Sequence, residues 1–149
     1  MYYDIFLIRN PQHLNQAFGV RRAVFIEEQN VPEEVENDEH DGAEGTLHFL
    51  AVDEQGVAVG TARLRAYEGE RGVGKVERVA VLREHRGKGL GTLLMEKVEE
   101  EALKHGFRSL KLNSQAHANV FYERLGYEAE GETFVEAGIE HIAMRKHFS

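Results

Sequence analysis

A glycine-rich segment at residues 86–94, RGKGLGTLL, lies between an apolar run at 73–82 and an amphipathic run at 90–105. The apolar run has the composition of a strand, and the amphipathic run repeats its apolar residues at helical spacing. Glycines in such a turn let backbone N–H groups approach a ligand closely, and the start of the helix adds unpaired donors and a partial positive charge. The segment therefore predicts a strand–turn–helix unit that binds a phosphorylated ligand.

Two familiar phosphate-binding loops fit the spacing poorly. The P-loop of nucleoside triphosphatases requires G-x-x-x-x-G-K-[ST], but Lys88 is followed by Gly89 instead of a hydroxyl residue. A dinucleotide fingerprint requires G-x-G-x-x-G in the first βαβ unit, whereas the glycines here are spaced G-x-G-x-G in mid-chain. The predicted strand at 109–113 also lacks a terminal acidic residue for a ribose. A nicotinamide-dependent oxidoreductase is therefore a weak alternative.

A third pattern, [RQ]-x-x-G-x-[GA], is satisfied by Arg86, Gly89 and Gly91. The flanking parts are a strand at 75–81, the helix at 90–105, and the motif FYERLGY at 121–127 beyond the next strand. In this order the parts resemble the GNAT superfamily of acetyl-CoA-dependent N-acetyltransferases over nearly the whole chain. A surface turn with flexible glycines would be enough to explain the short signature at 86–91. It would not explain why the strand, the helix and the FYERLGY motif follow one another in this order.

Three further segments, VFIEEQ at 24–29, QAH at 115–117 and GIEHI at 138–142, resemble the ElaA-like subgroup of that superfamily. The resemblance implies that residues 1–149 form one GNAT domain with acetyl-CoA as cosubstrate. It also implies a sheet with one splayed parallel strand pair, the pantetheine arm entering the gap between the two strands. A homodimer is compatible with the resemblance, which leaves the oligomeric state open.

The composition indicates a single-domain protein without disulfides or membrane-spanning segments. With 149 residues, of which 42% are apolar, the chain is long enough to bury one core. The sequence contains no cysteine, which excludes disulfides and thiol catalysis, and no signal-peptide or membrane-spanning pattern, so we expect a cytoplasmic protein. A net charge of −8 argues against nucleic acid as a partner and suits a cationic substrate better.

The apolar patterning predicts an α/β (α+β) fold with a mixed, mostly antiparallel sheet flanked by helices. Strands are expected at 2–8, 47–52, 57–67, 73–82, 109–113, 130–135 and 139–145, and helices from Pro11 to Glu28, from Leu90 to His105, and from about Ala116 to Leu125. The strand before the glycine segment and the strand after its helix form a βαβ unit, so these two should be parallel.

Glu77 is the first candidate for the general base. It interrupts the apolar strand ahead of the glycine segment, and strict alternation would put it on one face with Val79 and Val81, along the cofactor cleft. An amine nucleophile must lose a proton, and a carboxylate can accept it directly or through water. The alternative is a structural ion pair with Arg63 or Arg65 on the preceding strand.

Tyr122 is the candidate general acid. It lies in the FYERLGY motif, where GNAT enzymes commonly place a tyrosine whose hydroxyl faces the cofactor sulfur, so the resemblance implies that it protonates the departing thiolate. The alternative is a half-buried aromatic residue of a short helix. Retention of both Glu77 and Tyr122 favours an enzyme over a non-catalytic acyl-CoA-binding or regulatory module on the same fold.

The resemblance places the rest of the cofactor site on the strand and the glycine segment, chiefly through their backbones. Its members are Val79, Ala80, Val81, Arg86, Gly87, Lys88, Gly89, Leu90, Gly91 and Thr92. Many GNAT enzymes also carry an Asn about seven residues before the catalytic tyrosine, where this chain has Gln115. Asn113 and Asn119 lie nearby, so which of the three amides contacts the cofactor stays open.

The acceptor is a small-molecule or peptide amine that the sequence does not identify. Candidates for its site are Phe25, Glu28, His117 and His141, the histidines because imidazole transfers protons near neutral pH. Residues 27–45 carry nine carboxylates, which predict a solvated acidic loop or, alternatively, steering of a cationic acceptor. Asp38, His40 and Asp41 have metal-ligand side chains without a second set at characteristic spacing, so no metal is expected.

Overall fold

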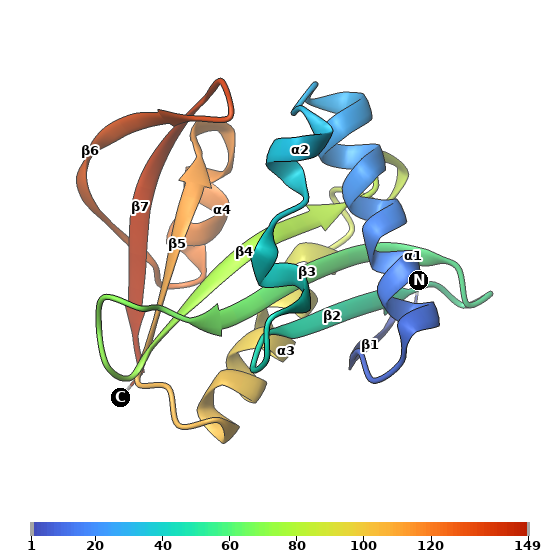
Figure 1. The fold of residues 1–149 in the computed structure, drawn as a ribbon, viewed down its shortest axis with the longest axis horizontal. Helices are drawn as coiled ribbons and strands as arrows, with labels where there is room; N and C mark the ends of the chain where they lie inside the picture. The colour runs from blue at the N-terminus through green and yellow to red at the C-terminus, as the bar shows by residue number, and fades with distance from the viewer. Residues whose placement is uncertain (1, 149) are drawn as a thin grey trace.

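The computed structural model describes residues 2–148 and contains a seven-stranded sheet with the order β1-β2-β3-β4-β5-β7-β6. The strands are β1 (Asp4–Leu7), β2 (Leu47–Val52), β3 (Ala58–Ala66), β4 (Val73–Val81), β5 (Ser109–Gln115), β6 (Glu128–Glu136) and β7 (Ile139–His147). Among the strands of the described residues, only β4 and β5 pair in parallel, and the other neighbours are antiparallel. Figure 1 shows β4 and β5 diverging toward their carboxyl ends. The predicted mixed sheet with one splayed parallel pair is confirmed.

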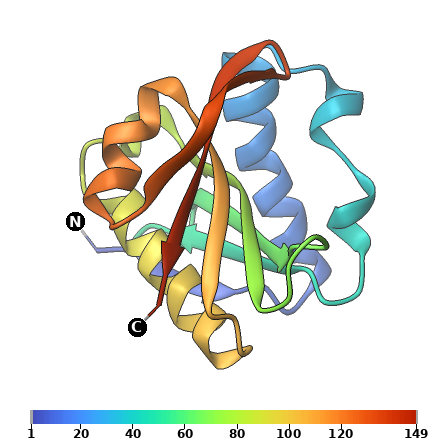
Figure 2. The same cartoon turned by 90° about the vertical axis from the view of Figure 1, so that its left-hand side faces the viewer.

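Helices cover both faces of this sheet (Figure 2). The elements are α1 (Pro11–Arg21), the π-helix η1 (Arg22–Glu28), α2 (Glu33–Glu36), α3 (Leu90–Lys104) and α4 (Asn119–Arg124), with short 3₁₀ turns η2 (Glu39–Gly42), η3 (Arg83–His85) and η4 (Ala116–Ala118). Helices α1 and α2 lie on one face and α3 and α4 on the other. Among the described residues, no helix combines the length and apolarity that a membrane crossing requires.

Local chemistry explains where the first helix begins. The Asn10 side chain accepts a hydrogen bond from the backbone N–H of His13 at 2.8 Å, and Pro11 occupies the first helical position. The helix predicted to run to Glu28 does so in two parts, because α1 continues directly into the wider turns of η1. This places the end of η1 beside β4 and the glycine segment.

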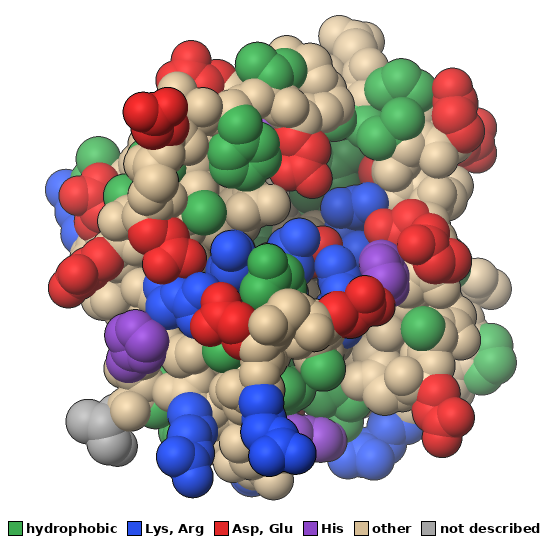
Figure 3. Space-filling view, turned by 60° about the vertical axis from the view of Figure 1, so that its left-hand side comes forward, with side chains coloured by type: hydrophobic (Ala, Val, Ile, Leu, Met, Phe, Trp, Pro, Cys, Tyr) green, Lys and Arg blue, Asp and Glu red, His purple; other side chains and the backbone are tan. Residues whose placement is uncertain are grey.

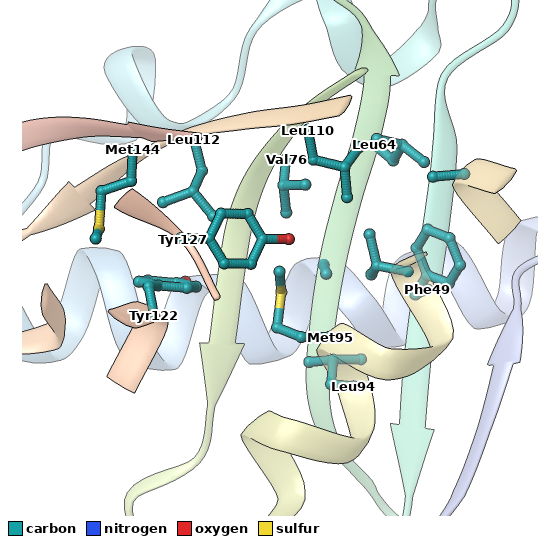
Figure 4. Packing of buried hydrophobic residues seen from close by; sticks show 13 residues of the cluster. Phe49, Leu64, Val76, Leu94, Met95, Leu110, Leu112, Tyr122, Tyr127 and Met144 are labelled. Atoms are coloured by element: carbon teal, nitrogen blue, oxygen red, sulfur yellow. The ribbon is translucent and has the colours of Figure 1, made fainter. Parts of the chain in front are cut away.

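The main core lies between the sheet and α3. Leu94, Met95 and Val98 from α3 are fully buried against strand residues that include Leu64 and Val76 (Figure 4). The helix buries these residues because they recur every three or four positions along one face. Removing any one large side chain here costs about 2–5 kcal/mol of stability. This core fixes α3, and with it the glycine segment, against β4.

A bulge in β4 creates the splay. Strand β4 pairs with β5 only from Val73 to Val76, and its register with β3 shifts beyond Glu77. At the shift Arg78 has φ 57, a left-handed conformation that is rare for a residue with a side chain. Ladder bonding to β5 therefore stops where the cleft begins.

The bulge also changes which side chains share a face of β4. Val79 packs with the core on the α3 side, whereas Ala80 packs with Val20 and Val24 on the α1 side. The expectation that strict alternation places Glu77 on one face with Val79 and Val81 is wrong. One extra residue at Arg78 inverts the alternation, so Glu77 shares its face with Ala80 instead.

Candidate active site

A cleft of about 810 Å³ opens where β4 and β5 separate. Its walls come from η1, α2, β4, β5 and β7, so segments far apart in the sequence meet around it. The backbone of Val79, Ala80 and Val81 lines one side, and Tyr122 lines it from α4. A groove along an unpaired strand offers backbone donors and acceptors to an extended ligand.

The glycine segment lies at the carboxyl end of β4 and presents unused donors. Among residues 2–148, no acceptor receives a hydrogen bond from the backbone N–H groups of residues 87–92. Gly87 and Gly89 have φ 75 and 82, and a Cβ at either position would meet open space. The backbone around Lys88 and Thr92 is therefore approachable, and it fits a pyrophosphate group. Leu90 contributes only its backbone, since its side chain is buried.

Gly91 differs from the other two glycines of the segment. A Cβ at this position would lie 3.0 Å from Cζ of Phe121 on α4. Phe121 in turn packs edge-on against Tyr122, with 4.9 Å between the ring centroids. Gly91 thus allows α3 and α4 to approach each other, which is a packing function in addition to the predicted place in the cofactor loop.

Arg86, predicted to contact the cofactor, binds Glu28, predicted to lie in the acceptor site. The two form a bidentate pair with both N–O distances at 2.7 Å, and Arg86 Nε also donates to the carbonyl of Val81 at 2.9 Å. The hydrogen bond from Arg86 lowers the pKa of the Glu28 carboxyl to about 2. Glu28 therefore stays ionised and holds Arg86 beside the glycine segment.

Glu77 is surrounded by cations. Its carboxylate accepts hydrogen bonds at 2.7 Å from Arg63 and from Arg65, and Lys75 lies 3.4 Å away. Burial alone would raise the pKa of Glu77, but the hydrogen bond from Arg65 and the charge of Arg63 outweigh burial and lower it to about 2. Such a carboxylate takes up a proton poorly near neutral pH. The geometry favours the ion-pair interpretation of Glu77 over the general-base one.

The ion pairs around Glu77 extend into a larger group, called here the arginine–carboxylate cluster. Its members are Arg21, Arg63, Arg65 and Arg78 with Glu36, Asp38, Asp41 and Glu77. Glu36 is only 3% exposed, and its partner Arg21 only 1%. The interpretation of residues 27–45 as a solvated acidic loop is therefore wrong for three of their carboxylates. Arginines from α1, β3 and β4 neutralise them.

Tyr122 is buried in the wall of the cleft. Burial raises the pKa of its phenol above the ordinary value, so the hydroxyl stays protonated. Within residues 2–148 this hydroxyl has no hydrogen-bond acceptor, and the ring is held edge-on between Phe121 and Tyr127. A fixed, protonated and uncommitted hydroxyl is what proton donation to a leaving group requires.

His141 and His117 both line the cleft, but only His141 is fixed. Its Nδ1 donates to the carbonyl of Ile139 at 2.7 Å, and its ring stacks on Phe134 with 5.8 Å between centroids. Because a carbonyl can only accept, Nδ1 carries the proton and Nε2 is the nitrogen that can accept one in the neutral ring. His117 is exposed on η4. Phe25 also lines the cleft, from η1.

The three candidate amides have different partners. Gln115 forms a reciprocal pair with Gln29 at 3.1 and 2.9 Å, which joins β5 to the end of η1. Asn113 lines the cleft and donates to Glu136 at 3.4 Å. Asn119 accepts from Ser114 at 2.9 Å at the start of α4 and does not line the cleft. Asn113 and Gln115 thus have the better positions for a ligand contact.

Several lining residues were missed by the sequence interpretation, notably Arg65, Lys75 and Arg78 on β3 and β4. Arg63 and Arg65 on one strand, and Lys75 and Glu77 on the next, recur at period two within apolar runs, and that spacing was the available signal. Within the described chain, no group of three or more His, Asp or Glu side chains is arranged to hold a metal ion.

The sequence model of the Acetyltransferase (GNAT) domain matches residues 10–148. The chain belongs to the GNAT acetyltransferase family. It is 38% identical to the uncharacterized N-acetyltransferase YjcF of Bacillus subtilis, over 94% of this chain and 96% of that protein. It is also 31% identical to protein ElaA of Escherichia coli, over 85% of this chain and 82% of that protein. The predicted membership of the ElaA-like subgroup is confirmed.

Solved GNAT structures share the fold. The crystal structure of Escherichia coli ElaA superposes with a TM-score of 0.87 at 26% identity, covering 98% of this chain and 100% of that one. An acyl-CoA N-acyltransferase from Pseudomonas aeruginosa gives a TM-score of 0.86 at 29% identity, covering 97% and 99%. This GNAT protein is therefore an acyltransferase of a family that uses acyl-CoA as cosubstrate.

Proposed function

We propose that this GNAT protein transfers the acetyl group of acetyl-CoA to a primary amine by direct attack in a ternary complex. The observation that carries the proposal is the unpaired end of β4, which runs between the free N–H groups of residues 87–92 and the buried hydroxyl of Tyr122. A ligand with a pyrophosphate at one end and a thioester at the other would follow this path, with its pantetheine arm along Val79–Val81.

In this proposal Tyr122 is the general acid and His141 is the general base. The acceptor nitrogen attacks the thioester carbonyl, the C–N bond forms, and the C–S bond breaks as the tetrahedral intermediate collapses. Tyr122 donates its proton to the departing sulfur, since burial keeps the phenol protonated. The surplus proton on the new amide nitrogen passes to Nε2 of His141, directly or through water. His141 then releases this proton to solvent, and Tyr122 regains one from solvent. Glu77 holds Arg65 and Lys75 in position instead of acting as the base.

A screen of primary amines with mass-spectrometric detection of acetylated products tests this proposal. We expect product from at least one amine, together with stoichiometric release of the CoA thiol. Acetyl-, propionyl- and succinyl-CoA compared on that amine would show whether acetyl is the preferred group. Tight binding of acetyl-CoA without turnover of any amine would instead support the alternative, a non-catalytic acyl-CoA-binding or regulatory module.

His141→Gln separates the base from the acid. We expect kcat to fall by about 100-fold in this variant, because glutamine cannot accept a proton. An unchanged kcat would remove His141 from the mechanism and leave solvent as the base.

A further inference from the structure

Four cationic side chains lie side by side across the sheet, called here the cationic row. In the strand registers Arg65 of β3 pairs with Lys75 of β4, Lys75 pairs with Lys111 of β5, and Lys111 pairs with Arg145 of β7. Residues paired in this way point to the same face of a sheet, and like charges placed directly opposite one another destabilise it. The row therefore needs anions nearby.

The protein supplies only part of that negative charge. Arg65 and Lys75 share the carboxylate of Glu77, which Arg63 also binds. At the other end, Glu130 lies 3.8 Å from Lys111 and 3.3 Å from Arg145, and Glu70 binds Arg145 at 2.7 Å, but Glu130 is 41% exposed and Glu70 is 47% exposed. Solvent weakens such exposed pairs.

At the cleft end of the row, Arg65 and Lys75 share one carboxylate, that of Glu77, which leaves part of their donors unused. Among the described residues, Nη1 of Arg65 has no acceptor, and the ammonium group of Lys75 faces only Glu77. Both residues line the cleft, and their side chains are 14% and 16% exposed. Lys and Arg side chains gather across the middle of this face, with acidic side chains around them (Figure 3). Arg65 and Lys75 therefore keep donors with which a further anion can pair.

The position of the row separates it from the pyrophosphate site. Lys75 pairs with Arg65 and Val81 pairs with Gly60 of β3, so the bulge leaves five ladder steps between Lys75 and Val81, or about 17 Å of strand. Val79 is about three steps from Lys75, or about 10 Å, so the row lies beyond the thioester end of the cleft. An anion bound there belongs to the acceptor.

We propose that the acceptor amine carries an anionic group, a carboxylate or a phosphate, several bonds away, and that Arg65 and Lys75 bind this group. This inference rests on the proposed acetyl transfer. It reverses the sequence expectation of a cationic acceptor, because Glu36, Asp38 and Asp41 are already paired with arginines. Guanidinium and ammonium donors beside each other suit the oxygens of either anion.

Three acceptors of equal length test the preference: 6-aminohexanoate, hexylamine and 1,6-diaminohexane, whose far ends are anionic, neutral and cationic. We expect kcat/KM to be at least about tenfold higher for 6-aminohexanoate than for hexylamine, as one charged hydrogen bond allows, and lowest for the diamine. 6-Aminohexyl phosphate in the same assay distinguishes a phosphate from a carboxylate. Equal rates for all three amines, or preference for the diamine, would overturn the proposal.

Substitutions in the cationic row test whether Lys75 causes the preference for an anionic acceptor. Lys75→Gln should lower kcat/KM for 6-aminohexanoate by about tenfold and for hexylamine by less than about twofold. Lys75→Glu should reverse the preference toward the diamine. Lys104→Gln, which removes a lysine 62% exposed on α3, is the matched control and should change neither value. If Lys75 variants fold poorly, Arg65→Gln, at the other cationic residue of the row that lines the cleft, should lower kcat/KM for 6-aminohexanoate in the same way.

The experiments distinguish an error in the anionic acceptor from an error in the proposed acetyl transfer. If acetyl-CoA binds and amines are acetylated without regard to their far-end charge, only the anionic acceptor is wrong. If no amine is acetylated, calorimetric titration of 6-aminohexanoate into the protein with bound CoA still decides the question. Binding at least tenfold tighter than that of hexylamine supports the inference, and equal or absent binding overturns it.

Discussion

The glycine segment follows the carboxyl end of β4, the arginine–carboxylate cluster is built around Glu77 and Arg78 within that strand, and the two use charge in different ways. The segment offers backbone N–H groups that have no acceptor among the described residues, so its donors depend on a ligand. The cluster pairs its guanidinium groups with carboxylates from the same chain, so it contributes to the fold itself. Changes in the segment should therefore affect binding, and changes in the cluster should affect stability.

Substitution of Gly89 should have the largest effect on binding. In Gly89→Val, a side chain is forced onto a residue with φ 82 and stands where a phosphate would approach the backbone. We expect acetyl-CoA affinity to fall by more than about 100-fold in calorimetry, because several N–H contacts are lost together. Gly56→Val is the matched control, since Gly56 has φ 81 and equally open surroundings in the β2–β3 turn. Equal loss of affinity in both variants would contradict the loop assignment.

Glu77→Gln should have the largest effect on stability. The change leaves Arg63, Arg65 and Lys75 without their shared carboxylate, which costs about 3 kcal/mol for a buried group. Urea unfolding at pH 7 measures this cost. Glu100→Gln, at an exposed ion pair on α3, is the control and should change stability by less than about 0.5 kcal/mol. A loss no larger than that of the control would mean that the cluster contributes no stability.

The pH dependence of stability tests the same carboxylate. Its pKa is lowered from 4.5 to about 2 in the folded protein, so the unfolded chain binds a proton first as the pH falls. The stabilisation by Glu77 is therefore complete above about pH 4.5 and is lost as the pH falls toward 2. We expect the stability difference between wild type and Glu77→Gln to shrink over this range, and a constant difference would contradict the pKa shift.

Tyr122→Phe should separate chemistry from binding. Loss of the proton donor should lower kcat by about 100-fold, while acetyl-CoA affinity stays nearly unchanged. Tyr127→Phe is the matched control, because that buried hydroxyl binds Glu99 at 2.9 Å instead of facing the cleft. Its kcat should change by less than about threefold. Unchanged turnover in Tyr122→Phe would remove this residue from the mechanism.

Glu28→Gln should have the smallest effect, and its sign is informative. Removing the carboxylate frees Arg86 for the pyrophosphate, so acetyl-CoA affinity should rise by about two- to fivefold, as expected for one exposed charge. Glu33→Gln, at the exposed Arg22–Glu33 pair, is the control. A fall in affinity would show that Glu28 positions Arg86 for binding instead of competing for it.

Most of the fold was predictable because its signals are local. The strand at 47–52 was predicted to the residue, and α3 ends one residue earlier than expected. Alternating apolar residues, the Asn10–Pro11 helix start and the glycines after the strand each act within a few positions. The glycine segment was found for the same reason.

The errors arose where distant residues decide the outcome. Arg78 adopts a left-handed φ that the neighbouring sequence does not predict. The resulting bulge places Val79 and Val81 on the opposite face of β4 from the one expected. The partners of Asp38 and Asp41 lie on strands and helices more than fifteen positions away, so the acidic segment was read as solvated. Gln29 and Gln115 are separated by 86 positions. Such pairings depend on how the elements pack.

Gly91 carries a consequence for how mutational scans of this family are interpreted. A larger residue there would push against Phe121, whose ring adjoins Tyr122, and would displace the proposed proton donor even if CoA still bound. A screen that records only activity would count such a variant as a cofactor-loop defect. The absence of a side chain at Gly91 matters both for the cofactor loop and for the position of Tyr122. Only measurements of both CoA affinity and turnover can therefore tell which of the two a substitution has damaged.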